Sequence, residues 1–587
     1  MPVRNAEVAA VFGEIADLLE IEGQNTFRVR AYRNAARMLG ELGSSVEAMV
    51  QEGADLDALP GIGPDLAGKI AEVVRTGTCP LLQKLRKELP PAVTQLLKLP
   101  GVGPKRVKRL VDGLGIRTVD ELHHAAEQGR VRELPGFGPR SEQHILDATA
   151  AQLRAPRRFR LIEVQPLADE LLGRLRAVPG VRQVLAAGSL RRGRDTVGDL
   201  DLLVTHAGGS GVMARFTADP RVREVLSAGA TRASVVLDNG LQVDLRAVAP
   251  ESFGAAAVYF TGSKAHNIAL RRLAQEAGLK VNEYGVFRGT QRVAGDTEES
   301  VYAAVGLPFI EPRLREDRGE IEAARQGRLP RLVELADLRG DLHAHTRESD
   351  GHDTLEAMVE AARARGLRYL AVTEHSRRLA VARGLDPVRL AKQIDRIDRL
   401  NARLHDFTVL KGIEVDILED GSLDLPDAIL SRLDLVVGAV HHRLDLPRAR
   451  QTERLLRAMD NRCFSVLAHP TGRLINERAG CDIDLLRIVR HARERGCFLE
   501  LNAHPARLDL DDTACQMAKA EGVLVSIASD AHSGIELDGL GQGIVQAQRG
   551  WLEAADVLNT RSLDELRPLL ARTMGRPEGR TPATAAR

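Results

Sequence analysis

Two aspartates that alternate with leucines constrain this chain more than any other feature of its sequence. Asp199 and Asp201 belong to a segment, residues 198–204, that otherwise reads as an apolar strand. Because successive side chains of a strand point to opposite faces, both carboxylates should lie on the same face. Residues 234–245 predict two more apolar strands joined by an Asn-Gly hairpin turn, and Asp244 on the second strand can join the pair if the hairpin lies beside the first strand.

Three carboxylates held close together repel one another unless cations lie between them. Oxygen ligands of this kind suit Mg²⁺ or Mn²⁺, and a pair of such ions can hold a triphosphate and activate an attacking hydroxyl. Gly188 and Ser189, just ahead of the strand, supply a tight turn with backbone N–H groups, and Arg192 supplies a charged donor for phosphate oxygens. An Asp-x-Asp pair alone is more often a solvated strand face, but the combined pattern favours metal-dependent nucleotidyl transfer.

A Leu-Pro-Gly-x-Gly-Pro motif occurs three times in the N-terminal part, at residues 59–64, 99–104 and 134–139, each time before an apolar helix. The glycines let the backbone approach a ligand closely, and the first amides of the next helix can bind a DNA phosphate. One copy could be a packing corner, but residues 84–109 also hold eight Lys/Arg and one acid although the net charge is only +1. The repeats therefore indicate contact with the DNA backbone, through Gly61, Gly63, Gly101, Gly103 and Lys105.

From residue 339 onward, apolar strand-like runs alternate with amphipathic helices, which predicts a closed parallel barrel. The runs are 339–343, 368–373, 407–415, 433–440, 464–468, 497–502 and 524–528. Histidines and carboxylates stand at the carboxyl ends of most of these runs, where barrels of this kind gather their chemistry. Eleven of the sixteen histidines lie beyond residue 340, and His with carboxylate suits Zn²⁺ or Mn²⁺.

A further motif follows the three aspartates, Tyr259-Phe260-Thr261-Gly262-Ser263. With this motif, the central segment resembles the palm of a family X (DNA polymerase beta-like) DNA polymerase. The three motifs at residues 59–139 resemble helix-hairpin-helix motifs, and the C-terminal part resembles the polymerase-and-histidinol-phosphatase (PHP) domain, a trinuclear metal phosphoesterase. The whole chain is similar to the bacterial form of the family. The resemblance implies a multidomain α+β and α/β fold: a helical helix-hairpin-helix N-terminal domain, a nucleotidyltransferase palm with a mixed sheet, and a distorted (β/α)7 barrel.

The domains implied are a helical lyase-like domain (1–90), a fingers-type DNA-binding subdomain (91–155), a catalytic palm (156–246), a nucleotide-selecting subdomain (247–315), a linker (316–338), the PHP domain (339–575) and a disordered tail (576–587).

The resemblance also assigns site residues. It places two metal ions on the catalytic residues Asp199, Asp201 and Asp244, the triphosphate on Gly188, Ser189, Arg192 and Gly198, the sugar on Tyr259, Phe260, Thr261 and Gly262, and the nascent base pair on Asn267 and Arg271. It places three ions, Zn²⁺ and/or Mn²⁺, on His343, His345, Asp350, His375, Glu414, His441, His469, Asp530 and His532. His441 is preferred over His442 because it follows the motif.

Lys69 stands where eukaryotic family members carry a Schiff-base lysine that removes a 5'-deoxyribose phosphate. A lysine must lose its proton to attack an aldehyde, so its pKa would have to be lowered. Asp65 occupies a neighbouring position that is often basic in the family. A lyase nucleophile and a simple contact to a 5'-phosphate therefore both remain open for Lys69.

The amino-acid composition narrows the class of protein to which this chain can belong. Charged residues make up 28% and hydrophobic residues 44%, which is typical of a globular protein, and no apolar run approaches the length of a membrane span. Five scattered cysteines without a CxxC pair favour a reducing cytoplasm. We expect a cytoplasmic monomer, without a membrane partner, that uses dNTPs on gapped or primer–template DNA.

The expected function is a DNA-directed DNA polymerase that fills short gaps in base excision repair or end joining, with a PHP-domain 3'-5' exonuclease and abasic-site endonuclease. Two alternatives belong to other classes: a small-molecule phosphatase with a non-functional polymerase half, and a DNA-end-binding scaffold. The helix-hairpin-helix repeats argue against the phosphatase. Two complete metal constellations argue against the scaffold, because bare carboxylate clusters are costly without ions.

Overall fold

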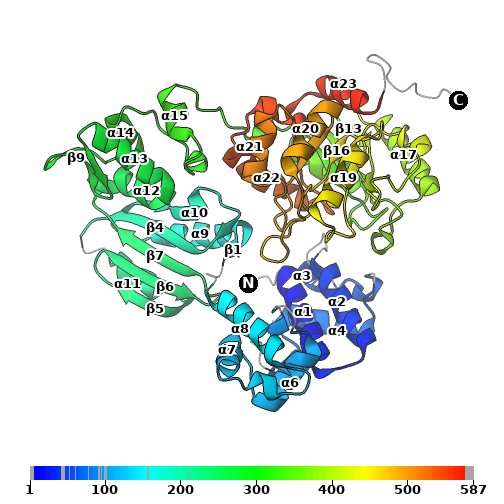
Figure 1. Ribbon diagram of the computed structural model, residues 1–587, viewed down its shortest axis with the longest axis horizontal. Helices are drawn as coiled ribbons and strands as arrows, with labels where there is room; N and C mark the ends of the chain where they lie inside the picture. Colours follow the sequence, from blue (N-terminus) through cyan, green and yellow to red (C-terminus); the bar gives the residue numbers. More distant parts are fainter. Residues whose placement is uncertain are drawn as a thin grey trace. The chain divides into compact units, whose positions relative to one another are not determined.

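The computed structural model describes residues 5–40, 46–51, 53–59, 61–76, 78–89, 93, 96–97, 99, 102–154, 158–208 and 211–575. Gly101 and the tail 576–587 lie outside these residues. Contacts divide the chain into two compact units, 1–157 and 158–587 (Figure 1). Among the described helices, none combines the length and the apolar character needed to cross a bilayer.

The N-terminal unit consists of helices around one apolar core. Its longer helices are α1 (Asn5–Glu22), α2 (Thr26–Gly40), α4 (Pro64–Thr76), α5 (Pro80–Glu88), α6 (Pro104–Leu114), α7 (Val119–Glu127) and α8 (Pro139–Arg154). Pro64, Pro104 and Pro139 each begin a helix, where the fixed φ of proline suits the first turn and its missing N–H costs nothing. The structure thus confirms that each of the three repeated motifs leads into a helix.

The second unit begins with a five-stranded mixed sheet, as the sequence predicts. Its strands are β2 (Val181–Ala186), β4 (Asp199–His206), β5 (Val222–Ala228), β6 (Arg232–Leu237) and β7 (Gln242–Ala247), in the order β2-β4-β7-β6-β5. β6 and β7 form the antiparallel hairpin, and β7 runs parallel to β4. Leu200 and Leu202 of β4 enter the core that includes helix α9 (Leu161–Arg176), whereas Asp199 and Asp201 occupy the opposite face.

A mostly helical segment follows the sheet. It contains α12 (Phe253–Thr261), α13 (Lys264–Glu276), the antiparallel strands β8 (Lys280–Asn282), β9 (Gly285–Arg288) and β10 (Gln291–Ala294), α14 (Glu298–Ala304) and α15 (Glu320–Arg325). Glu298 links this segment to the short helix α10 (Gly188–Arg191), because its carboxylate binds Arg191 of that helix. The same carboxylate also binds Arg315. Arg315 is fully buried, so this ion-pair network is screened little by solvent.

Seven strand segments of the C-terminal part pair in parallel with their neighbours. They are β11 (Gly340–Ala344), β12 (Tyr369–Val372), β13 (Thr408–Lys411) continued by β14 (Glu414–Asp416), β15 (Val437–Ala439), β16 (Val466–Leu467), β17 (Phe498–Asn502) and β18 (Val525–Ala528). A bridge between Ala344 and Ala531 joins the last segment to the first. The strands fall into a three-stranded and a five-stranded sheet, and this pairing is compatible with the predicted distorted (β/α)7 barrel.

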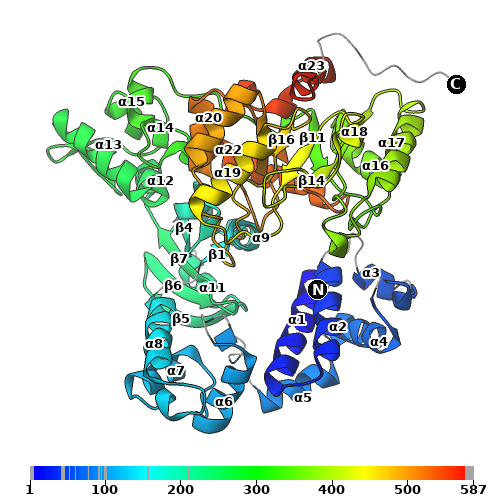
Figure 2. The same ribbon diagram turned by 45° about the vertical axis from the view of Figure 1, so that its right-hand side comes forward.

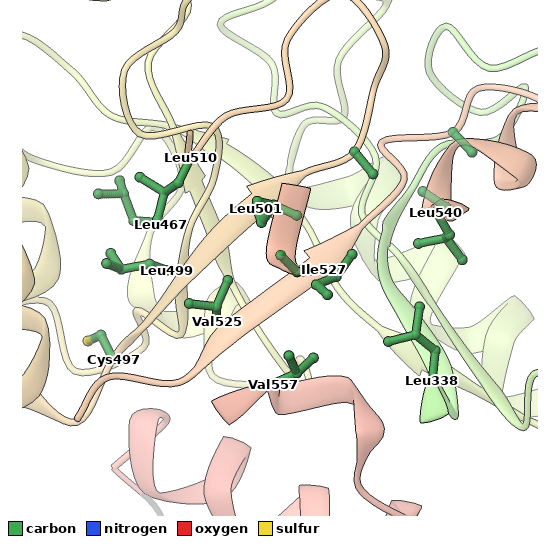
Figure 3. Close-up of a cluster of buried hydrophobic side chains, with 14 of the residues drawn as sticks. Leu338, Leu467, Cys497, Leu499, Leu501, Leu510, Val525, Ile527, Leu540 and Val557 are labelled. Atoms are coloured by element: carbon green, nitrogen blue, oxygen red, sulfur yellow. The ribbon is translucent and has the colours of Figure 1, made fainter. Parts of the chain in front are cut away.

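Helices surround this ring of strands. In Figure 2 they include α16 (Leu355–Ala364), α17 (Pro387–Asn401), α19 (Arg448–Met459), α20 (Leu485–Arg495) and α22 (Leu540–Arg549). Figure 3 shows part of the apolar layer, with Leu499 and Leu501 of β17 beside Val525 and Ile527 of β18. All four side chains are fully buried, and such burial contributes about 1.5–3 kcal/mol for each large aliphatic residue.

The side chain of Asn559 links the first strand, β11, to the last strand, β18, by hydrogen bonds. Its Nδ2 donates to the carbonyl oxygens of Gly340 and Ile527, each at 2.7 Å, and its Oδ1 accepts from the N–H of Ile527 at 3.0 Å. Asn559 is fully buried, so these backbone groups have no water to replace it.

We predict that Asn559→Ala lowers the free energy of unfolding of the barrel by about 3 kcal/mol, because three buried backbone groups lose their partner. Chemical unfolding followed by the fluorescence of Trp551, the chain's single tryptophan, measures the change. Asn401→Ala is the control, since Asn401 bonds only the backbone of Val409 in a half-buried position, and its cost should be smaller. Equal midpoints for Asn559→Ala and the unmodified protein would contradict the role of Asn559.

Candidate active sites

The three predicted polymerase carboxylates lie on neighbouring strands. β4 carries Asp199 and Asp201, and β7 carries Asp244. In the parallel register, Asp201 is directly beside Asp244 and Asp199 is beside Gln242. Because residues opposite each other share a face of the sheet, all three carboxylates lie on one face.

The electrostatic environment of this face disfavours bare carboxylates. Burial, followed by the charges of Asp199 and Asp244, raises the pKa of Asp201 to about 7, against the opposing effect of Arg246 and Arg192. Asp244 is held in place by the hydroxyl of Ser234 and by the amide of Gln242, which donates at 3.0 Å. A site that penalises ionisation of its own carboxylates is one that divalent cations would stabilise.

A cleft of about 910 Å³ opens beside these aspartates and is large enough for a nucleotide. Of the residues predicted for the site, it is lined by Gly188, Ser189, Arg192, Asp199, Asp201, Tyr259, Phe260, Thr261, Gly262, Asn267 and Arg271. Gly198 and Asp244 are not in this lining. Gly188 has a φ of +63°, and a Cβ at this position would lie 2.6 Å from Oδ2 of Asp201, so only glycine fits there.

Several contacts fix the orientation of the cleft side chains. Nε of Arg192 donates to Oε1 of Glu316 at 3.0 Å, and its Nη1 donates to the carbonyl oxygen of Thr261. Asn267 donates to the carbonyl oxygen of Tyr259 at 2.7 Å, and the guanidinium of Arg271 lies 5.0 Å from the Tyr259 ring centroid. Arg158, Arg194, Lys264, Ile268 and Glu316 also line the cleft, and the motifs did not indicate them.

The second site lies at the carboxyl ends of the barrel strands. Three groups of side chains there place ligand atoms within 4.8 Å of one another: His345, Asp350, His375 and His532; His343, His345 and Asp530; and His375, Glu414 and His441. His469 joins the third group, with its Nε2 2.9 Å from Oε1 of Glu414. The structure therefore brings all nine predicted ligands together in three overlapping groups.

Glu414 is the centre of the cluster. Its Oε2 lies 2.6 Å from Nδ1 of His375 and 3.7 Å from Nε2 of His345, and its Oε1 lies 3.3 Å from Nε2 of His441. His441 is half-buried whereas His442 is exposed, which agrees with the choice of His441.

Buried polar atoms without hydrogen-bond partners are concentrated in this cluster. They include Nε2 of His343, both ring nitrogens of His345 and Nδ1 of His469. Nδ1 of His375 and Oε2 of Glu414 are close to each other, but they are not oriented for a hydrogen bond. Such atoms are rare in folded proteins, because an unpaired buried polar group costs about 1–3 kcal/mol. A set of neighbouring unpaired nitrogen and carboxylate atoms fits metal ions.

Carboxylates outside the cluster orient its rings. Oε1 of Glu500 lies 2.6 Å from Nδ1 of His343, and Oε2 of the same residue accepts from the N–H of His469 at 2.7 Å. Oδ1 of Asp416 lies 3.1 Å from Nδ1 of His441. A carboxylate on the second ring nitrogen fixes the tautomer of a metal-binding histidine. The motifs gave no role to Asp416, although its position two residues after Glu414 puts it on the same face of the strand.

The N-terminal unit holds Lys69 and the remaining predicted DNA contacts. Lys69 is half-buried in α4, and its ammonium binds the carboxylate of Asp65. Burial lowers the Lys69 pKa, but the hydrogen bond to Asp65 and the charges of Tyr32 and Asp65 together outweigh it, and the pKa is raised overall. Gly61 and Gly63 precede α4, and Gly103 and the exposed Lys105 stand at the start of α6.

Comparison with known proteins identifies families that are similar to parts of this chain. Four family models match: a helix-hairpin-helix domain over residues 3–79, a SAM-like helix-hairpin-helix tandem over 93–150, the DNA polymerase beta thumb over 256–316 and the PHP domain over 341–504. A probable phosphatase of Thermoanaerobacter sp. (strain X514) is 27% identical over 232 residues, which are 38% of this chain and 89% of that protein.

Two polymerases are also similar to this chain. DNA polymerase lambda of Arabidopsis thaliana is 25% identical over 351 residues, covering 54% of this chain and 62% of that protein. The DNA polymerase/3'-5' exonuclease PolX of Bacillus subtilis (strain 168) is 38% identical over 570 residues, covering 96% of this chain and 99% of that protein. With one relative matching over almost its whole length, the chain belongs to the bacterial family X DNA polymerases that carry a C-terminal PHP domain.

Proposed function

We propose that this protein is a DNA-directed DNA polymerase that fills short gaps during DNA repair, and that its PHP domain is a separate 3'-5' exonuclease and abasic-site endonuclease. The observation that carries the proposal is the register of β4 and β7, which sets Asp201 beside Asp244 and next to a nucleotide-sized cleft. The name of the Bacillus subtilis relative, a DNA polymerase/3'-5' exonuclease, supports the same pair of activities.

In the polymerase site, Asp199, Asp201 and Asp244 would hold two ions, Mg²⁺ or Mn²⁺. When bound, these ions would lower the cost of forming the attacking oxyanion and of releasing pyrophosphate. Ser189 and Arg192 would orient the triphosphate of a dNTP. The segment from Tyr259 to Gly262, braced by Asn267 and Arg271, would enclose the sugar and exclude a ribose hydroxyl.

In the PHP site, the nine clustered ligands would hold three ions, Zn²⁺ and/or Mn²⁺. When bound, these ions would supply a hydroxide at neutral pH and polarise a phosphodiester. Glu500 and Asp416 would hold the imidazoles of His343 and His441 in the tautomers that leave the other nitrogen free for metal.

The remaining features belong to the same proposal. The N-terminal unit would bind the backbone of gapped or primer–template DNA through Gly61, Gly63, Gly101, Gly103 and Lys105, and the protein would act as a monomer in the cytoplasm. The seven domains would have the boundaries expected from the sequence. The phosphatase alternative loses support, because the phosphatase relative matches 38% of this chain whereas the polymerase relative matches 96% of it.

We predict that the two activities separate by mutation. Asp201→Asn should reduce gap filling by about 1,000-fold or more, because it removes a charged metal ligand, and should leave strand shortening unchanged. Glu414→Gln should do the reverse. A gapped duplex with a labelled primer, incubated with dNTPs and Mn²⁺, reports extension and shortening in one assay. Loss of both activities in either variant, with the fold intact, would contradict two independent sites.

We predict that Glu500→Gln weakens metal binding at the PHP site by about 10- to 100-fold, because His343 loses the acceptor that orients it. Elemental analysis after dialysis against a graded chelator measures the ions retained per chain. Glu494→Gln is the control, since Glu494 is an exposed residue of α20. Identical retention in Glu500→Gln and the unmodified protein would remove Glu500 from this role.

We predict that Lys69 becomes a better nucleophile when Asp65 is replaced. Asp65 raises the Lys69 pKa, so Asp65→Asn should shift the pH profile of borohydride trapping on an incised abasic site toward lower pH. Lys69→Ala should abolish trapping. If trapping persists in Lys69→Ala, another amine is the nucleophile and Lys69 contacts only the 5'-phosphate.

A further inference from the structure

The turn that carries Arg192 is packed against the PHP domain. Arg549, the last residue of α22, donates from Nη1 to the carbonyl oxygen of Arg192 at 2.8 Å. Further along the same turn, Nη1 of Arg473 lies 3.2 Å from Oδ2 of Asp195. Two arginines of the nuclease barrel therefore hold the backbone and a side chain of the triphosphate turn.

Packing at Gly193 shows how closely this turn lies against α22. Gly193 has a φ of +68°, and a Cβ there would lie 2.4 Å from Cγ1 of Val545, a residue of α22. It would also lie 1.9 Å from Nη1 of Arg313. A larger residue at this position would have to displace the side chains of Arg313 and Val545 and would be strained by the positive φ.

One carboxylate is shared between the two domains. Oε1 of Glu316 accepts from Nε of Arg192 and from Nη1 of Arg549, each at 3.0 Å. Arg549 is 2% exposed, and its Nη2 binds the carboxylate of Asp512. Removal of the Arg549 guanidinium would take this donor from the Arg192 carbonyl and would leave Glu316 with Arg192 and Asp512 with Arg318 as the remaining arginine partners.

Arg549 itself reaches neither site. It does not line the nucleotide cleft, and it is not one of the grouped metal ligands of the described residues. Its hydrogen bonds with the polymerase residues are those to Glu316 and to the backbone carbonyl of Arg192.

We propose that Arg549, a residue of the nuclease domain, is a positioning residue of the polymerase site. By fixing Glu316 and the Arg192 carbonyl, it presents the Arg192 guanidinium to the triphosphate of the incoming nucleotide. The PHP domain thus contributes to nucleotide affinity independently of its own metal ions. This inference rests on the proposed role of Arg192 in binding the triphosphate.

The test is steady-state gap filling by the full-length protein. Arg549→Met keeps the length of the side chain but removes its donors, and it should raise the KM for dNTP by about tenfold with kcat changed by less than about twofold. Shortening of a labelled strand by the same preparation should be unchanged. Arg549→Lys, which retains a charged donor for Glu316, should recover part of the loss.

Two comparisons make the result specific. Arg490→Met is the matched control, because Arg490 lies on α20 and pairs with Glu521 away from the polymerase residues, and its KM should equal that of the unmodified protein. In a Glu316→Gln background, adding Arg549→Met should raise KM by less than it does alone, since the two residues act through one contact. Full additivity would overturn the proposed route.

The outcomes separate this inference from the proposed function. If Arg192→Met raises KM and Arg549→Met does not, the inference fails and the nucleotide-binding role of Arg192 stands. If Arg192→Met leaves KM unchanged, the role of Arg192 itself fails. Should Arg549→Met lose both activities by unfolding, Asp512→Asn replaces it: a KM raised by about threefold with shortening retained supports the inference, and an unchanged KM overturns it.

Discussion

Repulsion between like charges on one face of a small sheet is the constraint on which the polymerase half depends. In the parallel register of β4 and β7, Asp201 lies directly beside Asp244, and Asp199 lies on the same face of the sheet. A one-residue slip would turn these carboxylates into the apolar core that Leu200 and Leu202 now occupy. The hydrophobic pattern of the strands therefore holds the three carboxylates close together although their charges repel one another. Bound cations would offset this electrostatic repulsion.

The PHP domain also holds ionisable side chains close together, but here they are histidines as well as carboxylates. Its ligands stand at the ends of fully buried strands, where no protein group forms a hydrogen bond to several ring nitrogens. Glu500 and Asp416 bind rings from behind the cluster and so limit their rotation. The barrel core of leucine, valine and isoleucine holds these strands in register, so the position of each ligand follows from packing remote from the chemistry.

Much of this arrangement could be predicted from local sequence. The two-residue period of β4, the turn at Asn239-Gly240 and the strand-then-ligand pattern beyond residue 339 each depend on neighbours in the chain, so a single sequence is enough to find them. The conflict between Lys69 and Asp65 was also visible, because residues four apart in a helix meet.

What escaped prediction depends on residues far apart in the chain. Glu316 meets Arg192 across 124 positions, and Arg549 meets Glu316 across 233, and no local period or motif marks either contact. Gly198 and Asp244 are absent from the cleft lining, which strand patterns alone do not specify.

The position of Asn559 has a consequence for the order in which the protein is made. The side chain that fastens β11 to β18 is encoded after every strand of the ring, so translation delivers all the ligand-bearing segments before it delivers the residue that locks them together. The backbone bonds between residues 343–345 and 530–531 can close the ring as soon as those residues are made, so the hydrogen bonds of Asn559 are added to strands that are already paired. The N-terminal unit, residues 1–157, is a separate compact unit and can fold while the C-terminal part is still being translated.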